Sequence, residues 1–373
     1  MQVAVIGAGA FGGWTALFLQ RLGAKVTLVD AWGPGNSRAS SGGETRVIRG
    51  TYGKEAVYTK MSFRALELWK EHEARWHRKL YRRTGALWMV VDAQGFEEVS
   101  IPHLREAGFT SEKLSADECA RRFPQINFEG VSWALLENEA GYLLARQSCT
   151  TVLDGFLQEG GQYLQSAVKP GSIQGTLANP PQLTDGSALR ADAYVYACGP
   201  WLGKLFPDVI GNLIHPTRQE VFFFGPAAGD NRYNEDHHPI WMNHGQIFYY
   251  GIPGNERRGF KVADDTRGPD FDPTTGERNV TPKNLEDARK FLEFRFPGMK
   301  SAPLLEARVC QYENSPDQHL IFDRHPKADN VWFLGGGSGH GFKHGPALGE
   351  FVASVVLGKT ANNPHFLLSR FKK

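Results

Sequence analysis

The sequence predicts a mixed α/β protein with two domains, and three observations lead to this prediction. First, the chain has 373 residues, whereas a single hydrophobic core rarely serves more than roughly 250 to 300 residues. Second, residues 2–30 follow the order strand, helix, strand. Third, β-rich segments such as "GALWMVVD" (85–92) and "RQEVFFFG" (218–225) interrupt the α/β pattern, which returns near the C-terminus. We therefore expect an α/β domain combined with a strand-rich domain.

Composition and charge narrow the class of function. The formal net charge is +2, with acidic and basic residues interspersed, so no basic surface for nucleic acid or an anionic membrane is expected. The four cysteines, at positions 119, 149, 198 and 310, form no CxxC pair, which fits a reducing compartment. The first strand begins at Gln2 and leaves no room for a signal peptide, and no apolar run reaches the roughly 20 residues that span a bilayer. We expect a cytoplasmic protein that acts on small molecules.

The first strand, helix and strand carry a dinucleotide-binding fingerprint, which predicts a Rossmann-like domain. Gly7 permits a tight turn after the first strand, Gly9 lets the backbone approach a pyrophosphate, and Gly12 allows close packing of the helix. The helix N-terminus would direct free N–H groups at the phosphates. Asp30, at the end of the second strand, can accept hydrogen bonds from ribose hydroxyls and would repel a 2′-phosphate. The fingerprint therefore favours NAD or FAD over NADP.

A second glycine-rich loop favours FAD. Residues 330–358, "NVWFLGGGSGHGFKHGPALGEFVASVVLG", predict a strand, a loop with five glycines and a helix from about Pro346. A helix that follows such a loop would place partial positive charge against a developing anion, such as the N1–C2=O edge of a reduced flavin. The middle of the chain has no second GxGxxG unit of the kind that a reductase carries for NAD(P)H. One FAD held from both ends of the chain explains both loops.

Two further segments give clear local patterns. Residues 307–326, "ARVCQYENSPDQHLIFDRHP", read as a β-hairpin around an Asn-Ser-Pro-Asp turn, with Cys310 in its first strand. A lone cysteine in an apolar strand is, taken by itself, most often a packing residue. Residues 283–298, "KNLEDARKFLEFRFPG", have the apolar spacing and charges of a surface helix.

Taken together, these segments resemble the D-amino-acid oxidase (glycine oxidase) superfamily of flavoproteins, and most closely its sarcosine oxidase-like family. The resemblance implies a discontinuous FAD-binding domain over 1–83, 143–213 and 314–373. It also implies a substrate domain with a large antiparallel sheet over 84–142 and 214–313, and a monomeric protein. The motifs that carry it are "SSGGETRVIRGTY" (40–52), "VYACGPW" (195–201), "FYYGIP" (248–253), "RVCQYENSPDQH" (308–319) and "GGSGHGFKHGP" (336–346), together with the fingerprint.

The resemblance also implies how FAD is held. In this family the cysteine of the "VCxY" strand is joined through its sulfur to the 8α carbon of FAD, which assigns a covalent link to Cys310. That reaction needs a thiolate, so nearby cations would help it. The other implied cofactor contacts, beyond the fingerprint residues and Asp30, are Thr45, Arg46, Val168, Gly199, Gly337, Gly339, Gly341 and Lys343.

The implied reaction is oxidation of an amine on a carbon that bears a carboxylate, with O₂ as the final acceptor. Arg49 and Lys343 occupy the family's carboxylate-binding positions, where a guanidinium offers a bidentate fork and an ammonium a point charge. Lys261 stands at the position of the lysine that activates O₂, a step that a buried cation favours. His340 matches a histidine near the substrate, and Tyr312 completes the expected catalytic set.

The sequence departs from the family at two positions. Asp265 takes the place of a histidine four residues after Lys261, and an acid would favour a cationic or hydroxyl-bearing group. Gly50 follows Arg49 where many members have histidine, and we expect the smaller residue to open the pocket. N-methyl amino acids, cyclic secondary amino acids such as pipecolate, N-methyltryptophan-like compounds and glycated or primary amino acids stay open as substrates. The alternatives are a dehydrogenase that uses an electron carrier, a flavoprotein with a structural flavin, and an NAD-linked dehydrogenase.

Overall fold

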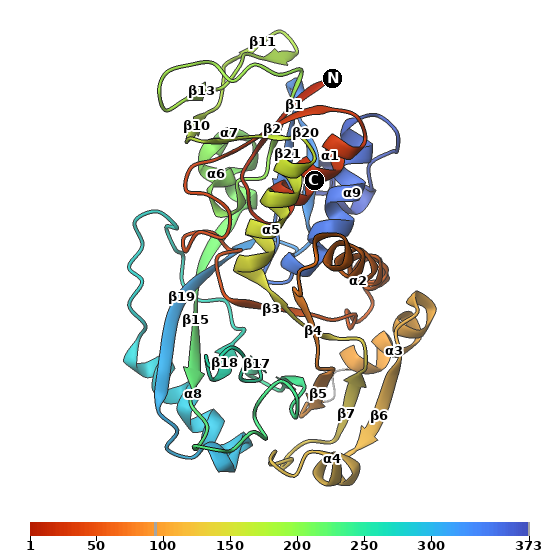
Figure 1. Cartoon of the computed structure of the whole chain (residues 1–373), viewed down its shortest axis with the longest axis vertical. Coiled ribbons are helices and arrows are strands. Elements are labelled where there is room, and N and C mark those ends of the chain that lie inside the picture. The colour runs from red at the N-terminus through yellow and green to blue at the C-terminus, as the bar shows by residue number, and fades with distance from the viewer. Residues whose placement is uncertain (93–94, 372–373) are drawn as a thin grey trace.

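A six-stranded sheet in the upper half of Figure 1 carries the N-terminal fingerprint. The computed structural model describes residues 1–92 and 95–371. The strand order is β20-β21-β14-β1-β2-β9, and every pair is parallel except β20 with β21. The predicted strand, helix and strand are confirmed as β1, α1 (Ala10–Arg21) and β2. The six strands are β1 (Gln2–Ile6), β2 (Lys25–Asp30), β9 (Gln162–Gln165), β14 (Ala193–Tyr196), β20 (Ile321–His325) and β21 (Ala328–Gly335).

Four helices cover this part of the protein. Helix α1 packs against α5 (Ala145–Gln158) and α9 (Gly345–Val356), and α2 (Ala56–Trp76) packs against α9. Helices α1 and α9 approach so closely that a Cβ on Gly349 would lie 2.6 Å from the main chain of Trp14. Trp14, Trp69 and Leu348 are fully buried in this core. Because α9 follows the second glycine-rich loop, its packing on α1 brings the two glycine loops together.

An eight-stranded sheet forms the lower half of Figure 1 and confirms the strand-rich part of the prediction. Its order is β19-β15-β18-β17-β16-β5-β7-β6. Neighbours are antiparallel except β16 with β5, which are parallel. Helix α8 (Pro282–Arg295) packs against β15 and β18, and its Leu292 is buried there with Trp241 and Phe260. The strands are β5 (Ala86–Val90), β6 (Ser111–Ser115), β7 (Trp133–Glu137), β15 (His215–Phe224), β16 (Ile240–His244), β17 (Phe248–Ile252), β18 (Phe260–Asp264) and β19 (Leu304–Asn314).

Smaller elements connect the two large sheets. A three-stranded sheet has the order β3-β8-β4, with β8 antiparallel to both neighbours. It is built from β3 (Thr45–Ile48), β4 (Tyr81–Arg83) and β8 (Gly141–Leu144). Two short hairpins, β10 (Val168–Lys169) with β13 (Gln182–Leu183) and β11 (Ile173–Gln174) with β12 (Leu177–Ala178), lie after β9. The remaining helices are α3 (Phe96–Ala107), α4 (Ala116–Arg122), α6 (Leu202–Leu205) and α7 (Pro207–Ile210), with 3₁₀ turns that include η1 (Gly199–Trp201) and η4 (Phe342–His344).

The hairpin predicted over residues 307–326 is wrong. Strand β19 pairs with β15 in the eight-stranded sheet, whereas β20 pairs with β21 in the six-stranded sheet. Residues 315–320 therefore connect the eight-stranded sheet to the six-stranded sheet. Two apolar runs around a polar turn occur both in a β-hairpin and in two strands that belong to different sheets. The two arrangements differ only in the strands with which each run pairs. The predicted domain boundaries stay predictions. Among the described residues, no helix is both long and apolar enough to cross a membrane.

Candidate active site

Two adjoining cavities lie where the two large sheets meet. The first, here called the cofactor cavity, is lined by Gly7, Gly9 and Asp30 of the fingerprint and by the turn after β14. The second, here called the substrate cavity, is lined by residues after β3, on β18 and β19, and in the glycine loop before α9. Four residues line both cavities and mark the boundary between them: Arg46, Gly339, Tyr312 and Phe342.

Most of the predicted cofactor contacts lie around the cofactor cavity. Gly12 lies behind the fingerprint turn, because a Cβ there would lie 1.8 Å from the carbonyl oxygen of Gly7. Thr45 is buried on β3, Lys343 lines the substrate cavity, and Cys310 lies on β19. The predicted residues that line the cofactor cavity are Gly7, Gly9, Asp30, Arg46, Val168, Gly199, Gly337, Gly339 and Gly341.

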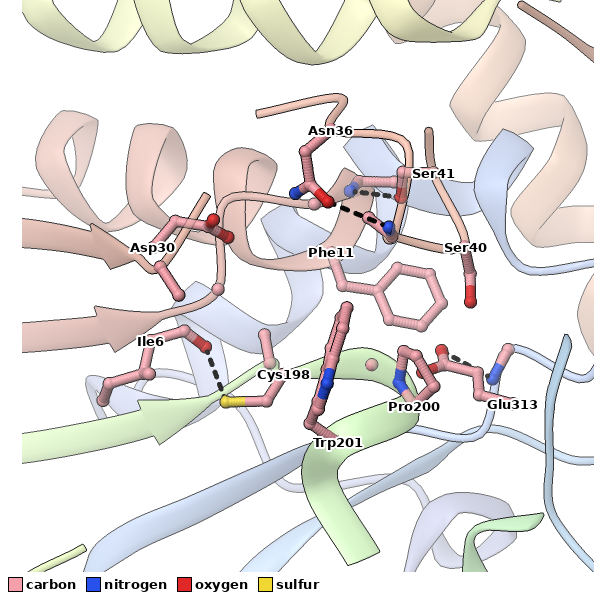
Figure 2. A pocket seen from close by; sticks show the side chains of 18 of the residues that line it. Ile6, Phe11, Asp30, Asn36, Ser40, Ser41, Cys198, Pro200, Trp201 and Glu313 are labelled. Carbon is pink, nitrogen blue, oxygen red and sulfur yellow. Dashed lines mark hydrogen bonds between the residues drawn. The ribbon is translucent and has the colours of Figure 1, made fainter. Parts of the chain in front are cut away.

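The geometry of this cavity fits a dinucleotide. Gly7 has a φ of +111°, and a Cβ there would lie 2.2 Å from the carbonyl oxygen of Ala197, so only glycine allows the tight turn. Two buried polar atoms of cavity residues, Ser40 Oγ and Glu313 Oε2, have no hydrogen-bond partner within the described ranges. Figure 2 shows Ser40 and Glu313 beside Phe11 in the cavity. Phosphate and hydroxyl groups of FAD would supply the missing partners.

Asp30 is the last residue of β2, and its carboxylate accepts hydrogen bonds from three main-chain amides. Its Oδ2 accepts a hydrogen bond from Ala8 N at 2.8 Å, and its Oδ1 accepts from Trp32 N at 2.9 Å and Gly33 N at 2.8 Å. These amides hold the carboxylate in place, and Figure 2 shows Asp30 among the side chains that line the cavity. A carboxylate oxygen can accept more than one hydrogen bond. Asp30 therefore keeps capacity for a ribose hydroxyl.

Cys310 lies beside the half-buried guanidinium of Arg46. Arg46 Nη2 donates to Cys310 Sγ at 3.3 Å and to the Ser40 carbonyl at 2.6 Å, while Nη1 donates to the Thr45 carbonyl at 2.9 Å. The structure thus places Cys310 beside a side chain that lines both cavities.

The substrate cavity brings together residues that are far apart in sequence. Arg49 follows β3, Lys261 lies on β18, Tyr312 lies on β19, and His340 and Lys343 lie in the loop before α9. All five predicted catalytic residues line this cavity. Within residues 1–92 and 95–371, neither Lys261 nor Lys343 forms a salt bridge with a carboxylate.

Lys343 is held by a tyrosine that the sequence analysis did not identify. Its Nζ donates to Tyr52 Oη at 2.8 Å and to the His340 carbonyl at 2.7 Å. Tyr52 Oη also lies 2.7 Å from His344 Nε2 and 3.2 Å from His340 Nδ1. Burial, together with the positive charge of Arg49, lowers the pKa of Lys343 well below its ordinary value. Tyr52 lies three residues after Arg49 in the same motif, and this position was the one feature of the sequence that could have identified it as a site residue.

The protonation of His340 follows from its partners. Its Nε2 lies 3.0 Å from the carbonyl oxygen of Gln318, which can only accept, so Nε2 carries the hydrogen. The Nδ1 atom therefore accepts the hydrogen bond from Tyr52. Burial, followed by the charge of Lys343, lowers the pKa of His340 to about 3. His340 is thus a neutral imidazole at the wall of the cavity.

A second unpredicted residue, Glu137, anchors the segment that carries Arg49 and Tyr52. Its carboxylate is fully buried. Its Oε2 accepts from Gly50 N at 2.6 Å, and its Oε1 accepts from Thr51 Oγ1 at 2.6 Å and Trp88 Nε1 at 2.8 Å. The guanidinium of Arg49 lies 4.9 Å from the ring centre of Trp88. Glu137 therefore sets the position of Arg49 without touching the cavity.

The expectation that Gly50 enlarges the pocket is wrong. Gly50 does not line the substrate cavity. A Cβ at this position would lie 2.6 Å from Phe109 and 2.7 Å from Leu104. The side chains of Phe109 and Leu104 thus fill the space beside Gly50, and this space is not part of the substrate cavity.

Lys261 and Asp265 both line the substrate cavity, and burial shifts the pKa of each toward its neutral form. Lys261 is 3% exposed, and burial, followed by the charge of Arg46, lowers its pKa to about 7. Asp265 lines the substrate cavity and accepts a hydrogen bond from Tyr312 Oη at 2.7 Å. Arg267 Nη1 lies 3.8 Å from the other oxygen of Asp265. Burial raises the pKa of Asp265. The acid that departs from the family pattern therefore faces the site.

Comparison with known proteins shows that this chain matches one family and is similar to several amino-acid oxidases of known name. The DAO family of FAD dependent oxidoreductases matches residues 2–355. Monomeric sarcosine oxidase of Bacillus sp. (strain B-0618) is 30% identical, with 97% of this chain and 94% of that protein covered. Peroxisomal sarcosine oxidase of Homo sapiens is 28% identical (98% and 95% covered). N-methyl-L-tryptophan oxidase of Salmonella enteritidis PT4 (strain P125109) is also 28% identical (99% and 98% covered).

Solved structures share the fold at lower identity. L-proline dehydrogenase from P. horikoshii superposes with a TM-score of 0.87 at 20% identity, covering 100% of this chain and 97% of that one. Fructosamine oxidase (Amadoriase II) from Aspergillus fumigatus has a TM-score of 0.81 at 20% identity, covering 98% and 89%. At these identities the likeness concerns the fold alone.

Proposed function

This chain belongs to the family of FAD-dependent oxidoreductases, and from this premise we propose that it is an oxidase of a secondary amino acid, N-methyl or cyclic. One observation carries the proposal. The substrate cavity adjoins the cofactor cavity, and Arg49 and Lys343 both line it without a salt-bridge partner within the described residues. A cation as buried as Lys343 is costly without an anion, so a substrate carboxylate is the natural partner of this pair.

Arg49 and Lys343 would hold that carboxylate between them. The Arg49 guanidinium lies 4.4 Å from the ring centre of Tyr52, and Tyr52 in turn binds Lys343. An arriving carboxylate favours the charged form of Lys343, whose pKa burial has lowered. The clamp would turn the substrate Cα–H toward the shared wall of the two cavities, where orientation counts most for the rate.

When bound, FAD supplies the acceptor for a hydride from Cα and the route for two electrons to O₂, which yields hydrogen peroxide and an imine that water hydrolyses. Lys261 is the residue of this chain that we assign to the oxygen step. Its buried ammonium lines the cavity, has no carboxylate partner within the described residues and would stabilise a developing oxygen anion. Neutral His340 would keep its Nδ1 lone pair on the Tyr52 hydroxyl at the wall of the cavity.

We also propose that FAD is linked to the sulfur of Cys310. The contact of Arg46 Nη2 with Sγ at 3.3 Å supports this, because it places the sulfur beside a side chain that lines the cofactor cavity. The test is acid precipitation of the purified protein. The parent protein should carry yellow colour into the pellet, and Cys310→Ser should release it into the supernatant. Colour released from the parent would contradict the covalent link while leaving FAD itself in place.

The relatives named sarcosine oxidase and N-methyl-L-tryptophan oxidase favour secondary amino acids among the possible substrates. Glycated amino acids rank lower, because the amadoriases are similar in fold only. The half-buried Asp265, which lines the substrate cavity, favours a substrate side chain with a cationic or hydroxyl group. We further propose a monomer that works in the cytoplasm, in line with relatives named monomeric and with four free cysteines.

An anaerobic substrate screen tests the function. Secondary, primary and glycated amino acids are mixed with the protein without O₂, and flavin absorbance is followed. Bleaching by N-methyl or cyclic amino acids is expected, and failure of every amine to bleach the flavin would contradict the proposal. Readmission of air with a peroxide assay separates an oxidase from a dehydrogenase that needs an electron carrier. L-proline dehydrogenase has the same fold, so this second step is necessary.

A further inference from the structure

Glu313 is a buried carboxyl group in the cofactor cavity that the proposed chemistry does not use. It lies on β19 and is 6% exposed. Its Oε1 accepts a hydrogen bond from Gly337 N at 3.2 Å, and its main-chain carbonyl accepts one from Ser338 N at 3.0 Å. Its Oε2 has no hydrogen-bond partner in the part of the chain that the structure describes. Such an atom requires a partner, and in this position the partner is a ligand.

The carboxyl group faces the dinucleotide-binding turn. A Cβ on Gly199 would lie 3.0 Å from Oε2, and one on Gly337 would lie 2.9 Å from Oε1, so two cavity glycines leave room around the group. Gly199 follows β14, and the end of β14 touches the fingerprint at Gly7. Figure 2 shows the Glu313 carboxyl beside Pro200 and close to the Phe11 ring. The phosphates of a dinucleotide are held at this turn.

No positive charge balances an ionised Glu313. It forms no salt bridge within the described ranges, and burial raises its pKa to about 7 against one opposing amide hydrogen bond. The titratable groups that face this corner are the Cys198 thiol after β14 and the Asp30 carboxylate at the end of β2. Strand β15 opposes it with Pro216, and α1 presents Phe11. Arg46 is the cation that lines the same cavity, but its guanidinium donates to the Ser40 and Thr45 carbonyls and to Cys310 Sγ and forms no salt bridge with Glu313.

We propose that Glu313 is protonated in the holoenzyme and donates a hydrogen bond from its Oε2 hydroxyl to a phosphate or ribityl oxygen of FAD. The inference rests on FAD as the cofactor of the proposed function. An ionised Glu313 would bring a negative charge against the pyrophosphate and would have no donor to offer. Because only the neutral form binds, FAD affinity should fall as the pH rises through the pKa of the free protein.

Reversible FAD binding provides the test. The Cys310→Ser protein is stripped of FAD and titrated with FAD between pH 6 and pH 9, with flavin fluorescence as the readout. The Kd should be constant at low pH and rise by about tenfold per pH unit above the pKa of Glu313. In the Glu313→Gln variant the amide can still accept from Gly337 and donate to FAD. Its Kd should match the parent at pH 6 and stay constant to pH 9.

Two control variants identify the titrating group. Cys198→Ala removes the thiol that faces this corner, and Glu306→Gln changes a glutamate on the same strand that lines neither cavity. Both should keep the pH dependence of the parent. A Kd of the parent that does not change with pH would overturn the proposal. So would a pH dependence that survives in Glu313→Gln or disappears in Cys198→Ala.

The outcomes separate this inference from the proposed function. A protein that binds FAD at no pH contradicts the proposed function itself, whereas tight binding without pH dependence contradicts only the role of Glu313. Circular dichroism of each apoprotein checks folding. If Glu313→Gln does not fold, the pH profiles of the parent and of Cys198→Ala still decide between the two titratable groups.

Discussion

Removal of the Tyr52 hydroxyl tests whether the buried network positions Lys343. In Tyr52→Phe the ring keeps its contact with the Arg49 guanidinium, whose carbon lies 4.4 Å from the ring centre. The change removes only the oxygen that binds Lys343 Nζ at 2.8 Å, His344 Nε2 at 2.7 Å and His340 Nδ1 at 3.2 Å. Packing is therefore nearly preserved while three polar contacts are lost.

The structure sets the size of the expected effect. Each buried hydrogen bond contributes about 1 kcal/mol, so the three together predict a loss of about 3 kcal/mol in the free energy of unfolding. Lys343 keeps one partner, the His340 carbonyl at 2.7 Å. The loss of one orienting bond, worth about 1.4 kcal/mol, should weaken the binding of a substrate carboxylate about tenfold. Because the Tyr52 oxygen accepts a hydrogen bond from the Lys343 ammonium, its removal favours the neutral amine, and this weakening should increase as the pH rises.

Tyr58→Phe is the matched control. Tyr58 is a buried neighbour whose hydroxyl lies 2.9 Å from Leu320 N and 3.2 Å from His319 Nδ1, and it makes no contact with Lys343. Chemical denaturation should show a loss of about 2 kcal/mol for this variant. Anaerobic titration with the best amino acid of the screen should give an unchanged Kd. Equal changes in Kd for the two variants, or an unchanged Kd in Tyr52→Phe, would refute the reasoning.

Two further predictions concern Lys261 and Glu137. Lys261→Met should leave anaerobic flavin reduction intact but slow reoxidation by O₂ on the order of 100-fold. Since the pKa of Lys261 is about 7, stopped-flow reoxidation of the parent should slow as the pH rises above that value, and a normal rate in the variant would remove Lys261 from its role. Glu137→Gln turns an amide donor toward Gly50 N or toward the Thr51 and Trp88 donors, and should cost about 2 to 3 kcal/mol in urea denaturation. Glu139→Gln, at a half-buried glutamate, should cost less, and equal losses would count against a special role for Glu137.

The sequence alone predicted the glycine-rich turn of the cofactor cavity, because that turn depends on local chemistry. A glycine-rich turn between a strand and a helix can be recognised from about thirty neighbouring residues, because each glycine answers a steric need within that segment. The same holds for the second glycine-rich loop and for α8, whose bounds of Pro282–Arg295 agree with the predicted surface helix. The motif that holds Arg46 and Arg49, by contrast, was identified through the resemblance to a known family.

What the sequence by itself determined was the α/β class, the dinucleotide fingerprint and the group of basic residues assigned to the site. Only the tertiary structure decided which residues meet. It paired β19 with β15 and left the predicted hairpin unformed. It also brought Tyr52 to Lys343 and Glu137 to Gly50, and it left one oxygen of Glu313 facing the cofactor cavity. The physical reason is that these contacts join segments tens to hundreds of residues apart, and burial, which shifts pKa values and requires hydrogen-bond partners, exists only once those segments have packed.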